Sequence, residues 1–429
     1  MFKTIPYHKT GYFSKTALDY LSQSEDIRDF YDLFPTIDNF KKQIEHKSDF
    51  SVSKRKTLVK TLEGQYKDIN TSSTTKENIQ LLLDSNTFTI TTGHQLNLFT
   101  GPLYFLYKII STINLCETLQ VKYPKQKFVP IYWMATEDHD FEEIQYFNFK
   151  HKKVKWHRES SGAVGRLSTK GLDAVFNEIK QVFGTSKNGQ KLTKLFKESY
   201  LQHDNLTDAT RFLTNELFAD YGLVIIDADS KELKHEFAPF IEEELLKNTA
   251  YHQVSKTNKE LSKHYKIQVN PREINLFYLT NNIRERIIFK DNKYLINNTN
   301  ISFSWEDFLI EVSNHPERFS PNVILRPLYQ EVVLPNLCYI GGGGELAYWL
   351  ELKAYFEKVG VVFPILLLRN SALLLSDKQH RKLNKLVVSK EELFLKQTDL
   401  IHQKVKEVSN LNMDFSTMYK QKFHFFSYF

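Results

Sequence analysis

Short runs of consecutive apolar residues recur along the chain, separated by longer segments in which apolar residues return every three or four positions. The runs predict strands at 86–92 (NTFTITT), 128–135 (FVPIYWMA), 223–228 (LVIIDA), 323–325 (VIL), 336–340 (NLCYI) and 361–368 (VVFPILLL). Strands that are apolar without alternation are typical of a parallel sheet covered by helices on both faces. The pattern therefore predicts an α/β fold built on a doubly wound parallel sheet.

The spacing of these strands predicts the domain organisation. Residues from 1 to about 80 are polar and show helical periodicity, so a helical segment precedes the sheet. Two long intervals, at about 150–220 and about 230–320, are interpreted as insertions into one domain that spans residues 1–375. Helical periodicity returns in the last part of the chain, and residues 376–429 are expected to form a C-terminal helical region.

A helix is predicted at 103–117, directly after the first strand. Thr100 suits its N-cap and Pro102 suits its first turn. Apolar residues lie on two faces of this segment, which predicts a helix buried in the body of the protein.

Composition argues against several classes of protein. The 429 residues carry 57 basic and 51 acidic side chains, and this net charge of +6 does not argue for a nucleic-acid partner. The two cysteines cannot build a disulfide framework or a cysteine-rich metal site. We see no signal-peptide pattern and no apolar run of the ~18 residues that a membrane span needs. We therefore expect no membrane partner and a cytoplasmic location.

The first candidate site is the turn between the first strand and the next helix. It contains Gly93, His94 and Gln95, followed by Thr100 and Gly101. In open α/β sheets, ligands bind beyond the carboxyl ends of the strands, and a helix start there attracts anions. The segment is therefore a candidate phosphate or carboxylate site. An ordinary turn with a packed histidine remains the alternative.

The second candidate is the acidic sequence Glu137, Asp138, His139 and Asp140, which follows the strand at 128–135. Four titratable residues after an apolar strand are costly to bury unless they are solvated or paired. They could act as a general base, bind an ammonium group or ligate Mg²⁺. Their spacing matches no specific metal motif, so no metal ligand is assigned, and a solvated loop remains the alternative.

The third candidate is the glycine run 341–344, which joins a strand to a helix. Gly343 lies within it, and Glu345, Tyr348 and Trp349 follow. Glycines allow a ligand to approach the backbone closely. The run lacks the lysine and hydroxyl ending of a nucleotide-binding P-loop, and a flexible tight turn is the alternative.

Isolated basic residues in apolar surroundings form a fourth group. Lys108, Arg326 and Arg369 could each hold a carboxylate or a phosphate, or could form a structural salt bridge. Asp227 and Asp229, at the end of a predicted strand, are weaker candidates of the same kind.

These segments occur in an order that resembles one known family. The blocks TTGHQLNLFTGPLYFLYKII, PIYWMATEDHDFEEI and NVILRPLYQEVVLPNLCYIGGGGELAYWLELK, with HPERFSPN before the last, resemble the bacillithiol-biosynthesis cysteine-adding enzymes. The similarity runs from about residue 85 to 375. Each block alone is a weak signal, but the ordered set is specific.

The resemblance implies a Rossmann-like core related to class I aminoacyl-tRNA synthetases, with two inserted connecting regions and a C-terminal helical coiled coil that forms a homodimer. It also implies a reaction that joins cysteine to the amine of glucosaminyl malate, the last step of bacillithiol synthesis. The small-molecule substrates would then be cysteine and glucosaminyl malate.

Two departures from the family pattern affect these expectations. The family usually has GGQQ-like residues where this chain has Thr92 to Gln95, so a role for His94 is not carried over from it. The family also continues through a longer helical region, whereas this sequence ends in KFHFFSYF after an apolar stripe at Ile401, Val405 and Val408. We therefore expect weakened dimerisation from a shortened coiled coil.

The chemistry implied by the resemblance assigns roles to the candidate residues. Amide formation from a free carboxylate needs an activated acyl group, for which an adenylate made from ATP, or another nucleotide with Mg²⁺, is one route. His139 or a neighbouring carboxylate would take the proton of the sugar ammonium. Arg326 and Lys108 would hold the two carboxylates of malate.

Two other functions remain open at this point. One is a binding or scaffold protein of the same pathway, without catalysis. The other is a nucleotidyltransferase-like enzyme that acts on a different amine acceptor.

Overall fold

The computed structural model describes residues 4–408. The chain divides into two compact units, Asp19–Ser371 and a smaller one that combines Met1–Leu18 with Ala372–Phe429. The larger unit contains the sheet that the apolar runs predict, and it is the part that positions the candidate site.

A parallel five-stranded sheet forms the centre of the larger unit, in the order β12-β11-β1-β2-β5. Its strands are β1 (Thr87–His94), β2 (Lys127–Met134), β5 (Val224–Asp227), β11 (Asn336–Gly341) and β12 (Ile365–Leu368). Along the chain, β2 and β5 are added on one side of β1, and β11 and β12 are then added on its other side. This is the strand order of a Rossmann-like fold, so the predicted fold class is confirmed.

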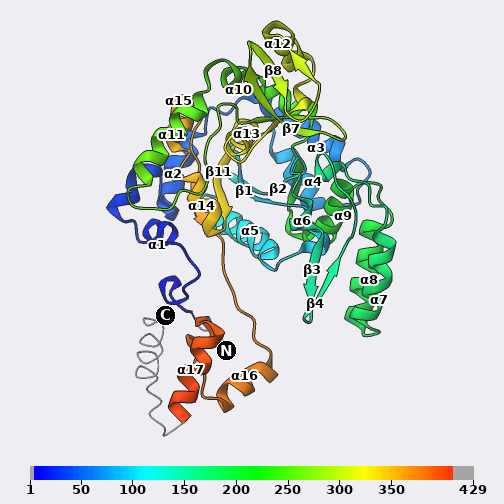
Figure 1. The fold of residues 1–429 in the computed structure, drawn as a ribbon, viewed down its shortest axis with the longest axis vertical. Helices are drawn as coiled ribbons and strands as arrows, with labels where there is room; N and C mark the ends of the chain where they lie inside the picture. The colour runs from blue at the N-terminus through cyan, green and yellow to red at the C-terminus, as the bar shows by residue number, and fades with distance from the viewer. Residues whose placement is uncertain (1–3, 409–429) are drawn as a thin grey trace, which may run out of the picture. The chain divides into compact units, whose positions relative to one another are not determined.

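Helices cover both faces of this sheet (Figure 1). Tyr132 and Trp133 are neighbours in β2, so their side chains point to opposite faces. Tyr132 contacts Phe105 of α5 (Tyr104–Lys122) at 5.4 Å between ring centroids. Trp133 contacts Tyr329 of α13 (Leu325–Val333), also at 5.4 Å. The two helices therefore lie on opposite faces, as a doubly wound sheet requires.

The core under the sheet is aliphatic and aromatic. One cluster joins Phe40 of α2 (Ile37–His46) to Ile90 of β1 and Leu119 of α5. Both cysteines, Cys116 and Cys338, lie in the same cluster and are free thiols. The interpretation of both as core residues is consistent with this burial.

The N-terminal segment is helical, as its periodicity predicts. Besides α2, its helices are α1 (Lys15–Leu21), α3 (Val52–Tyr66) and α4 (Ser73–Leu81), with 3-10 turns at Tyr7–Lys9 and Glu25–Phe30. In the larger unit, buried side chains tie this segment to the sheet, as when Gln43 donates to the carbonyl of Phe363 at 3.0 Å.

The two long intervals between strands have different architectures. The first contains the hairpin β3–β4 (Tyr146–Phe149, Lys152–Lys155) and helices α7 (Leu172–Phe183), α8 (Lys187–Tyr200) and α9 (Leu206–Phe218). The second contains α10 (Lys231–Lys247), α11 (Thr249–Leu261), α12 (Trp305–Asn314) and an antiparallel sheet in the order β10-β6-β7-β8-β9. The strands of that sheet are Phe319–Pro321, Leu276–Leu279, Arg284–Lys290, Lys293–Ile296 and Ser302–Phe303.

Short elements complete the larger unit. They are α6 (Phe141–Ile144), α14 (Gly343–Trp349) and α15 (Lys353–Lys358), with 3-10 turns at Leu98–Thr100, Val164–Arg166, Ala219–Tyr221 and Pro316–Arg318.

The strand predicted at 323–325 is wrong. Helix α13 begins there instead, at Leu325, and the Asn322 side-chain oxygen accepts from the amides of Ile324 and Leu325 at 2.9 and 3.3 Å in the turn before it. Pro327 then lies in the first turn, where a missing N–H costs nothing. A run of three apolar residues cannot distinguish a strand from the start of a buried helix.

The helix after the first strand begins later than predicted. Its N-cap residue is Leu103, and no side chain caps it. Thr100 has a φ of 71° and precedes the helix, so it is not the N-cap. The helix is buried through Phe105 and Ile109, but Ile110 is exposed, so only one of the two apolar faces is fully covered.

The smaller unit contains α16 (Asp377–Lys385) and α17 (Gln397–Val408), with a 3-10 turn at Glu392–Phe394. A capping box forms at Ser389: its amide donates to Glu392 at 2.6 Å, and the amide of Glu392 donates to the Ser389 hydroxyl at 3.2 Å. It begins the 3-10 turn rather than a long helix. The aromatic tail of the sequence lies outside the described residues.

No helix within residues 4–408 is long and apolar enough to cross a membrane.

We predict that Arg55 is a main structural residue of the N-terminal segment. It is fully buried in α3, and its guanidinium donates to the carbonyls of Leu82, Thr87 and Ser85 at 2.9–3.3 Å. Arg55→Met should lower the free energy of unfolding by about 3 kcal/mol or more, since three buried carbonyls lose their donor. Urea unfolding measures this. Lys56→Met, at the exposed next position, is the control, and equal effects in both variants would contradict the prediction.

Candidate functional site

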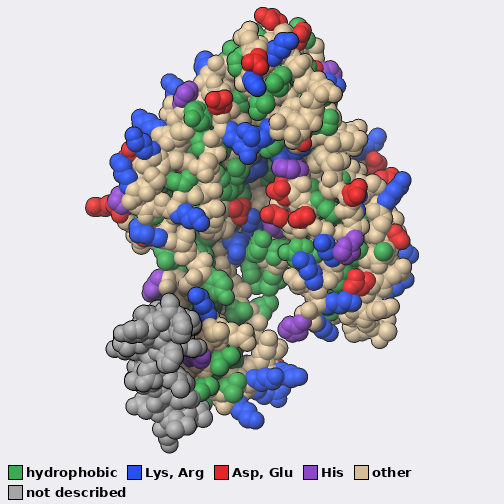
Figure 2. Space-filling view, viewed as in Figure 1, with side chains coloured by type: hydrophobic (Ala, Val, Ile, Leu, Met, Phe, Trp, Pro, Cys, Tyr) green, Lys and Arg blue, Asp and Glu red, His purple; other side chains and the backbone are tan. Residues whose placement is uncertain are grey.

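The candidate site lies at the carboxyl ends of the parallel strands. Strands β1 and β11 are neighbours, but the connections that follow them lead to opposite sides of the sheet. Such a reversal opens a crevice at the strand ends, where open α/β sheets bind ligands. Figure 2 shows a hollow in the middle of the larger unit, with acidic and basic side chains gathered around it.

An ion pair crosses this reversal point. Lys108 of α5 donates to Gly93 O at the end of β1 at 2.7 Å, and its Nζ lies 2.6 Å from Glu345 Oε2 of α14. Lys108 is only 4% exposed. The segments after β1 and after β11 are thereby joined, and three predicted site residues lie together.

Glu345 is the centre of this group. Tyr339 donates its hydroxyl to Oε1 at 2.6 Å, and the amide of Gly342 donates to Oε2 at 2.8 Å. Burial would raise the pKa of Glu345, but Lys108 and these two donors outweigh it and lower that pKa below its ordinary value. Glu345 is therefore a stable anion, and its charge neutralises Lys108.

Arg326 lies beside this group, in the first turn of α13. Its guanidinium donates to Gln330 Oε1 and to the Tyr348 hydroxyl, both at 3.2 Å, and lies 5.6 Å from the centre of the Tyr339 ring. Within the described part of the chain it forms no ion pair with a carboxylate. Gly93 leaves room for the Tyr339 side chain, because a Cβ at position 93 would lie only 3.2 Å from the Tyr339 hydroxyl.

Arg369, which follows β12, is a second guanidinium near the reversal point. Its amide donates to Gly341 O at 2.8 Å, and its guanidinium lies 5.0 Å from the centre of the Tyr104 ring. It too lacks a carboxylate partner among residues 4–408. Two arginines with uncompensated charge therefore lie near the paired Lys108 and Glu345.

His94 is packed rather than exposed to the crevice. It is 9% exposed and contacts the rings of Tyr104 and Phe105 at 5.5 and 5.2 Å. Burial, and after it the charges of Lys108 and Arg369, lower the pKa of His94 well below its ordinary value. The imidazole is therefore neutral at physiological pH, which agrees with the alternative of a packed histidine.

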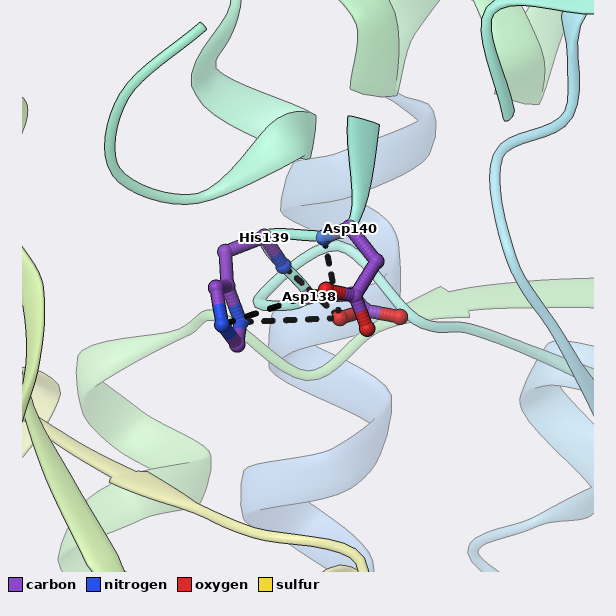
Figure 3. A group of neighbouring side chains, drawn as sticks. All are labelled: Asp138, His139 and Asp140. Carbon is purple, nitrogen blue, oxygen red and sulfur yellow. Dashed lines mark hydrogen bonds and ion pairs between the residues drawn. The ribbon is translucent and has the colours of Figure 1, made fainter. Parts of the chain in front are cut away.

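Asp138, His139 and Asp140 come together after β2, with ligand atoms within 4.8 Å of one another (Figure 3). Arg284, from β7 of the second insertion, has its Nη1 2.5 Å from His139 Nδ1. A guanidinium can only donate, so Nδ1 of His139 is the acceptor in this contact. Burial, and then the charge of Asp138, raise the pKa of Asp140.

Gln95 connects the first two candidate segments. Its amide nitrogen donates to Asp138 Oδ2 at 2.8 Å and to Glu143 Oε2 at 2.9 Å. A cavity of about 600 Å³ opens beside these groups. The described residues that line it carry amide, aromatic, aliphatic and acidic side chains, together with Gly101, and none of them is a lysine or an arginine.

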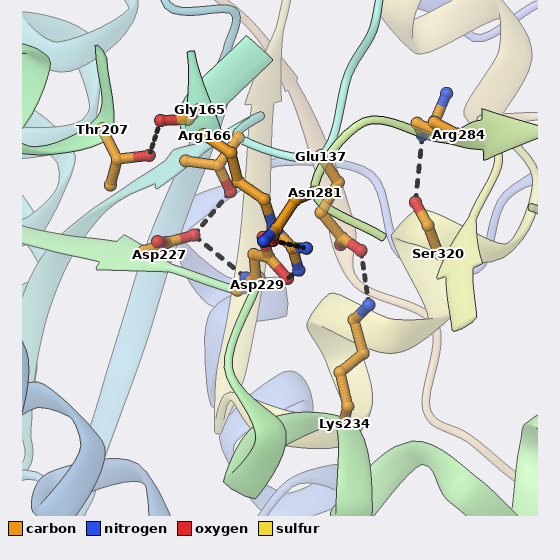
Figure 4. Close-up of polar contacts among 12 residues, drawn as sticks. Glu137, Gly165, Arg166, Thr207, Asp227, Asp229, Lys234, Asn281, Arg284 and Ser320 are labelled. Atoms are coloured by element: carbon orange, nitrogen blue, oxygen red, sulfur yellow. Dashed lines mark hydrogen bonds and ion pairs between the residues drawn. The ribbon is translucent and has the colours of Figure 1, made fainter. Parts of the chain in front are cut away.

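The inserted regions supply partners that the sequence analysis did not identify (Figure 4). Arg166 holds Asp229 through two hydrogen bonds, at 2.7 and 2.8 Å. Lys234 forms an ion pair with Glu137 and also donates to the carbonyl of Phe319 at 2.7 Å. Glu137 therefore has a structural partner. Single basic residues in long polar segments carry no pattern that would have revealed these contacts.

Asp227, at the end of β5, also has a hydrogen-bond partner in the loop after β2. Thr136 donates its hydroxyl to Asp227 Oδ1 at 2.5 Å. Burial, and then Asp229, raise the pKa of Asp227. The weaker candidates Asp227 and Asp229 thus help to hold the loop after β2 against the end of β5.

Three other predicted site residues lie in the core or at the ends of helical elements. Trp349 is fully buried and packs on Tyr339 at 4.8 Å between ring centroids, so it belongs to the core. Gly343 is the first residue of α14. Thr100 lies in the 3-10 turn before α5.

The acidic group contains side chains that could ligate a metal ion. Asp138, His139 and Asp140 are the one set of three such ligands found in residues 4–408. Arg284 places a positive charge against His139 and occupies one of its two ring nitrogens. The two aspartates alone retain carboxylate oxygens that suit Mg²⁺.

The comparisons with known proteins identify the family of the chain. The family model described as "Bacillithiol biosynthesis BshC, N-terminal Rossmann-like domain" matches residues 1–370. "Putative cysteine ligase BshC" of Flavobacterium johnsoniae is 58% identical over 411 residues, covering 96% of this chain and 78% of the relative. The proteins of the same name from Christiangramia forsetii and Bacillus thuringiensis are 55% and 30% identical, covering 96% and 90% of this chain and 78% and 73% of theirs. This chain therefore belongs to the BshC family of bacillithiol biosynthesis.

Proposed function

We propose that this protein is a ligase that joins cysteine to the amine of glucosaminyl malate, the last step of bacillithiol synthesis. The observation that carries the proposal is the division of charge in the crevice. Arg326 and Arg369, which form no ion pair within residues 4–408, lie at the reversal point, and carboxylates gather after β2. An acceptor with two carboxylates and one ammonium group needs both environments.

The malate carboxylates would bind at the two arginines. Lys108, predicted for this role, is neutralised by Glu345 at 2.6 Å, so Arg369 is the better second anchor. A planar guanidinium can hold a carboxylate through two parallel hydrogen bonds. Arg326 uses two of its donors on Gln330 and Tyr348 and retains others for a ligand.

The sugar ammonium would lie near the acidic group after β2, beside Asp138 and Glu143. An ammonium group has no lone pair, so it must lose a proton before it can attack. His139 is a poor base in this arrangement, because Arg284 uses the Nδ1 lone pair. Asp140, whose pKa burial and Asp138 raise, is the carboxylate better matched to the task.

The cysteine carboxylate must be activated before the amine attacks it. A nucleotide with Mg²⁺ would supply that activation. With Arg326 and Arg369 assigned to the acceptor carboxylates and Asp140 to proton transfer, Asp138 would offer carboxylate oxygens to the ion. The 600 Å³ cavity has no basic lining and suits an uncharged or amine-bearing group such as the sugar.

Product formation tests the function directly. Purified protein is incubated with cysteine and glucosaminyl malate, with and without ATP and Mg²⁺, and the amide is detected by mass spectrometry. A scaffold protein would bind the acceptor and make no product. A nucleotidyltransferase acting on another amine would consume nucleotide without making this amide, and either result would reject the proposal.

We also propose a cytoplasmic enzyme. Its two cysteines are free thiols buried in the core, which fits a reducing compartment.

We predict that Arg326 binds the acceptor. Arg326→Lys keeps the charge but loses the planar fork, so the dissociation constant for glucosaminyl malate should rise about tenfold or more, roughly 1.4 kcal/mol. Arg326→Ala should raise it further. Isothermal titration calorimetry measures both. Arg318→Lys, at a partly exposed arginine paired with Glu311, is the control. Unchanged affinity in both Arg326 variants would leave only a structural role.

We predict that Asp140 is the general base. Asp140→Asn should lower kcat by about a hundredfold, within the range of general-base catalysis. A base must be deprotonated, so the wild-type rate should fall as the pH drops through the raised pKa of Asp140, and the variant should lose this acid limb. A pH–rate profile measures it, with Glu142→Gln on the same turn as control. An unaltered acid limb in Asp140→Asn would assign the proton transfer elsewhere.

We propose a homodimer formed through α17, where Ile401 and Val405 are 51% and 47% exposed. Coiled-coil association needs three to four sustained heptads, and the described part of this helix provides 12 residues, so we predict weak dimerisation. Light scattering over a concentration series should show dissociation in the micromolar range, and Ile401→Asp should shift it to monomer. A dimer that persists at nanomolar concentration would show that the affinity is underestimated here.

A further inference from the structure

A buried chain of polar side chains leads from the N-terminal segment to Arg326. The Arg326 Nη1 donates to Gln330 Oε1 at 3.2 Å, one helical turn later on α13. Gln330 Nε2 in turn donates to Glu331 Oε1 at 3.0 Å. Gln330 and Glu331 are 0% and 2% exposed, so neither contacts solvent in the crevice.

Glu331 determines which way the Gln330 amide points. A side-chain amide has one accepting oxygen and one donating nitrogen, and an ionised carboxylate can only accept. The nitrogen of Gln330 must therefore face Glu331, which turns the oxygen toward Arg326. A reversed amide would place its oxygen against the carboxylate and its N–H groups against the guanidinium.

Glu331 is held from three directions. Lys47, 5% exposed at the end of α2, lies 3.1 Å from Oε2, and Asn336 of β11 donates to Oε1 at 2.7 Å. Asn336 is itself fixed, because its own oxygen accepts the Thr91 hydroxyl of β1 at 2.8 Å. Burial raises the pKa of Glu331, and Lys47 and the two amide donors oppose that shift.

The choice of an amide beside Arg326 has a chemical consequence. A carboxylate at position 330 would form an ion pair with the guanidinium and compete with a ligand carboxylate. The amide holds one N–H of Arg326 and leaves its positive charge uncompensated. Tyr348 holds the other terminal nitrogen at 3.2 Å, so the plane of the fork is fixed from both sides.

We propose that Gln330 and Glu331 are positioning residues that hold Arg326 as a charged, oriented fork for a carboxylate of the acceptor. The proposal rests on the function proposed above and adds residues that touch no substrate. Their effect on the acceptor passes through Arg326 alone.

The test is a double-mutant cycle on acceptor affinity. Gln330→Met removes both hydrogen bonds at similar volume, and it should raise the dissociation constant for glucosaminyl malate, and for malate as a simpler probe, about tenfold. KM for cysteine should stay unchanged. In the Arg326→Ala background, Gln330→Met should have no further effect on acceptor affinity.

Gln43→Met is the matched control. Gln43 is also a fully buried glutamine, and it donates to Phe363 O at 3.0 Å, outside this chain of contacts. Both variants should lose stability, but only Gln330→Met should lose acceptor affinity. If Gln330→Met does not fold, Gln330→Asn, which keeps the amide and shortens its reach, enters the same cycle.

The outcomes separate this proposal from the proposed function. Unchanged affinity in the Gln330 variants, or an equal loss in the Arg326→Ala background, overturns the positioning role even if the enzyme makes product. A coupled loss of acceptor affinity in a protein that makes no product supports the positioning role and rejects the ligase function. Absence of any binding to the wild-type protein overturns both.

Discussion

Lys108, which is buried, and Glu345, which is 24% exposed, form an ion pair at the point where β1 and β11 run side by side. Removing two charges from water costs several kcal/mol per ion unless the pair has good geometry and further hydrogen bonds. Both requirements are met here, because Gly93 O accepts from Lys108, and the Gly342 amide and the Tyr339 hydroxyl donate to Glu345. The pair joins the segments that leave the two central strands, and the shape of the crevice depends on it.

This pair also decides which cations are available to a ligand. Lys108 has a carboxylate partner and a carbonyl partner, so binding an anion would require it to leave both. Arg326 and Arg369 have aromatic and amide neighbours instead, which orient a guanidinium without neutralising it. Lys108 therefore stabilises the fold, whereas Arg326 and Arg369 remain available to bind an anionic ligand.

The same distinction holds among the acidic residues at the other end of the crevice. Glu137 and Asp229 are paired with Lys234 and Arg166 from the inserted regions, and they secure those regions to the sheet. Asp138 and Asp140 keep exposed carboxylate oxygens beside the cavity, although Arg284 lies against the histidine between them. The insertions therefore shape the chemistry of the site as well as cover it.

The sequence alone determined the sheet and the place of the site. Five of the six predicted strands form, because an apolar run of strand length is a local signal, and the polar residues that follow parallel strands must gather at one edge. The strand predicted at 323–325 does not form, because Asn322 holds a turn there that leads into helix α13. The roles of individual charges were decided only by the tertiary structure. The partners of Lys108, Glu137 and His139 lie far away in sequence, at Glu345, Lys234 and Arg284. No periodicity encodes such a contact, and whether a charge is neutralised or free depends on that partner.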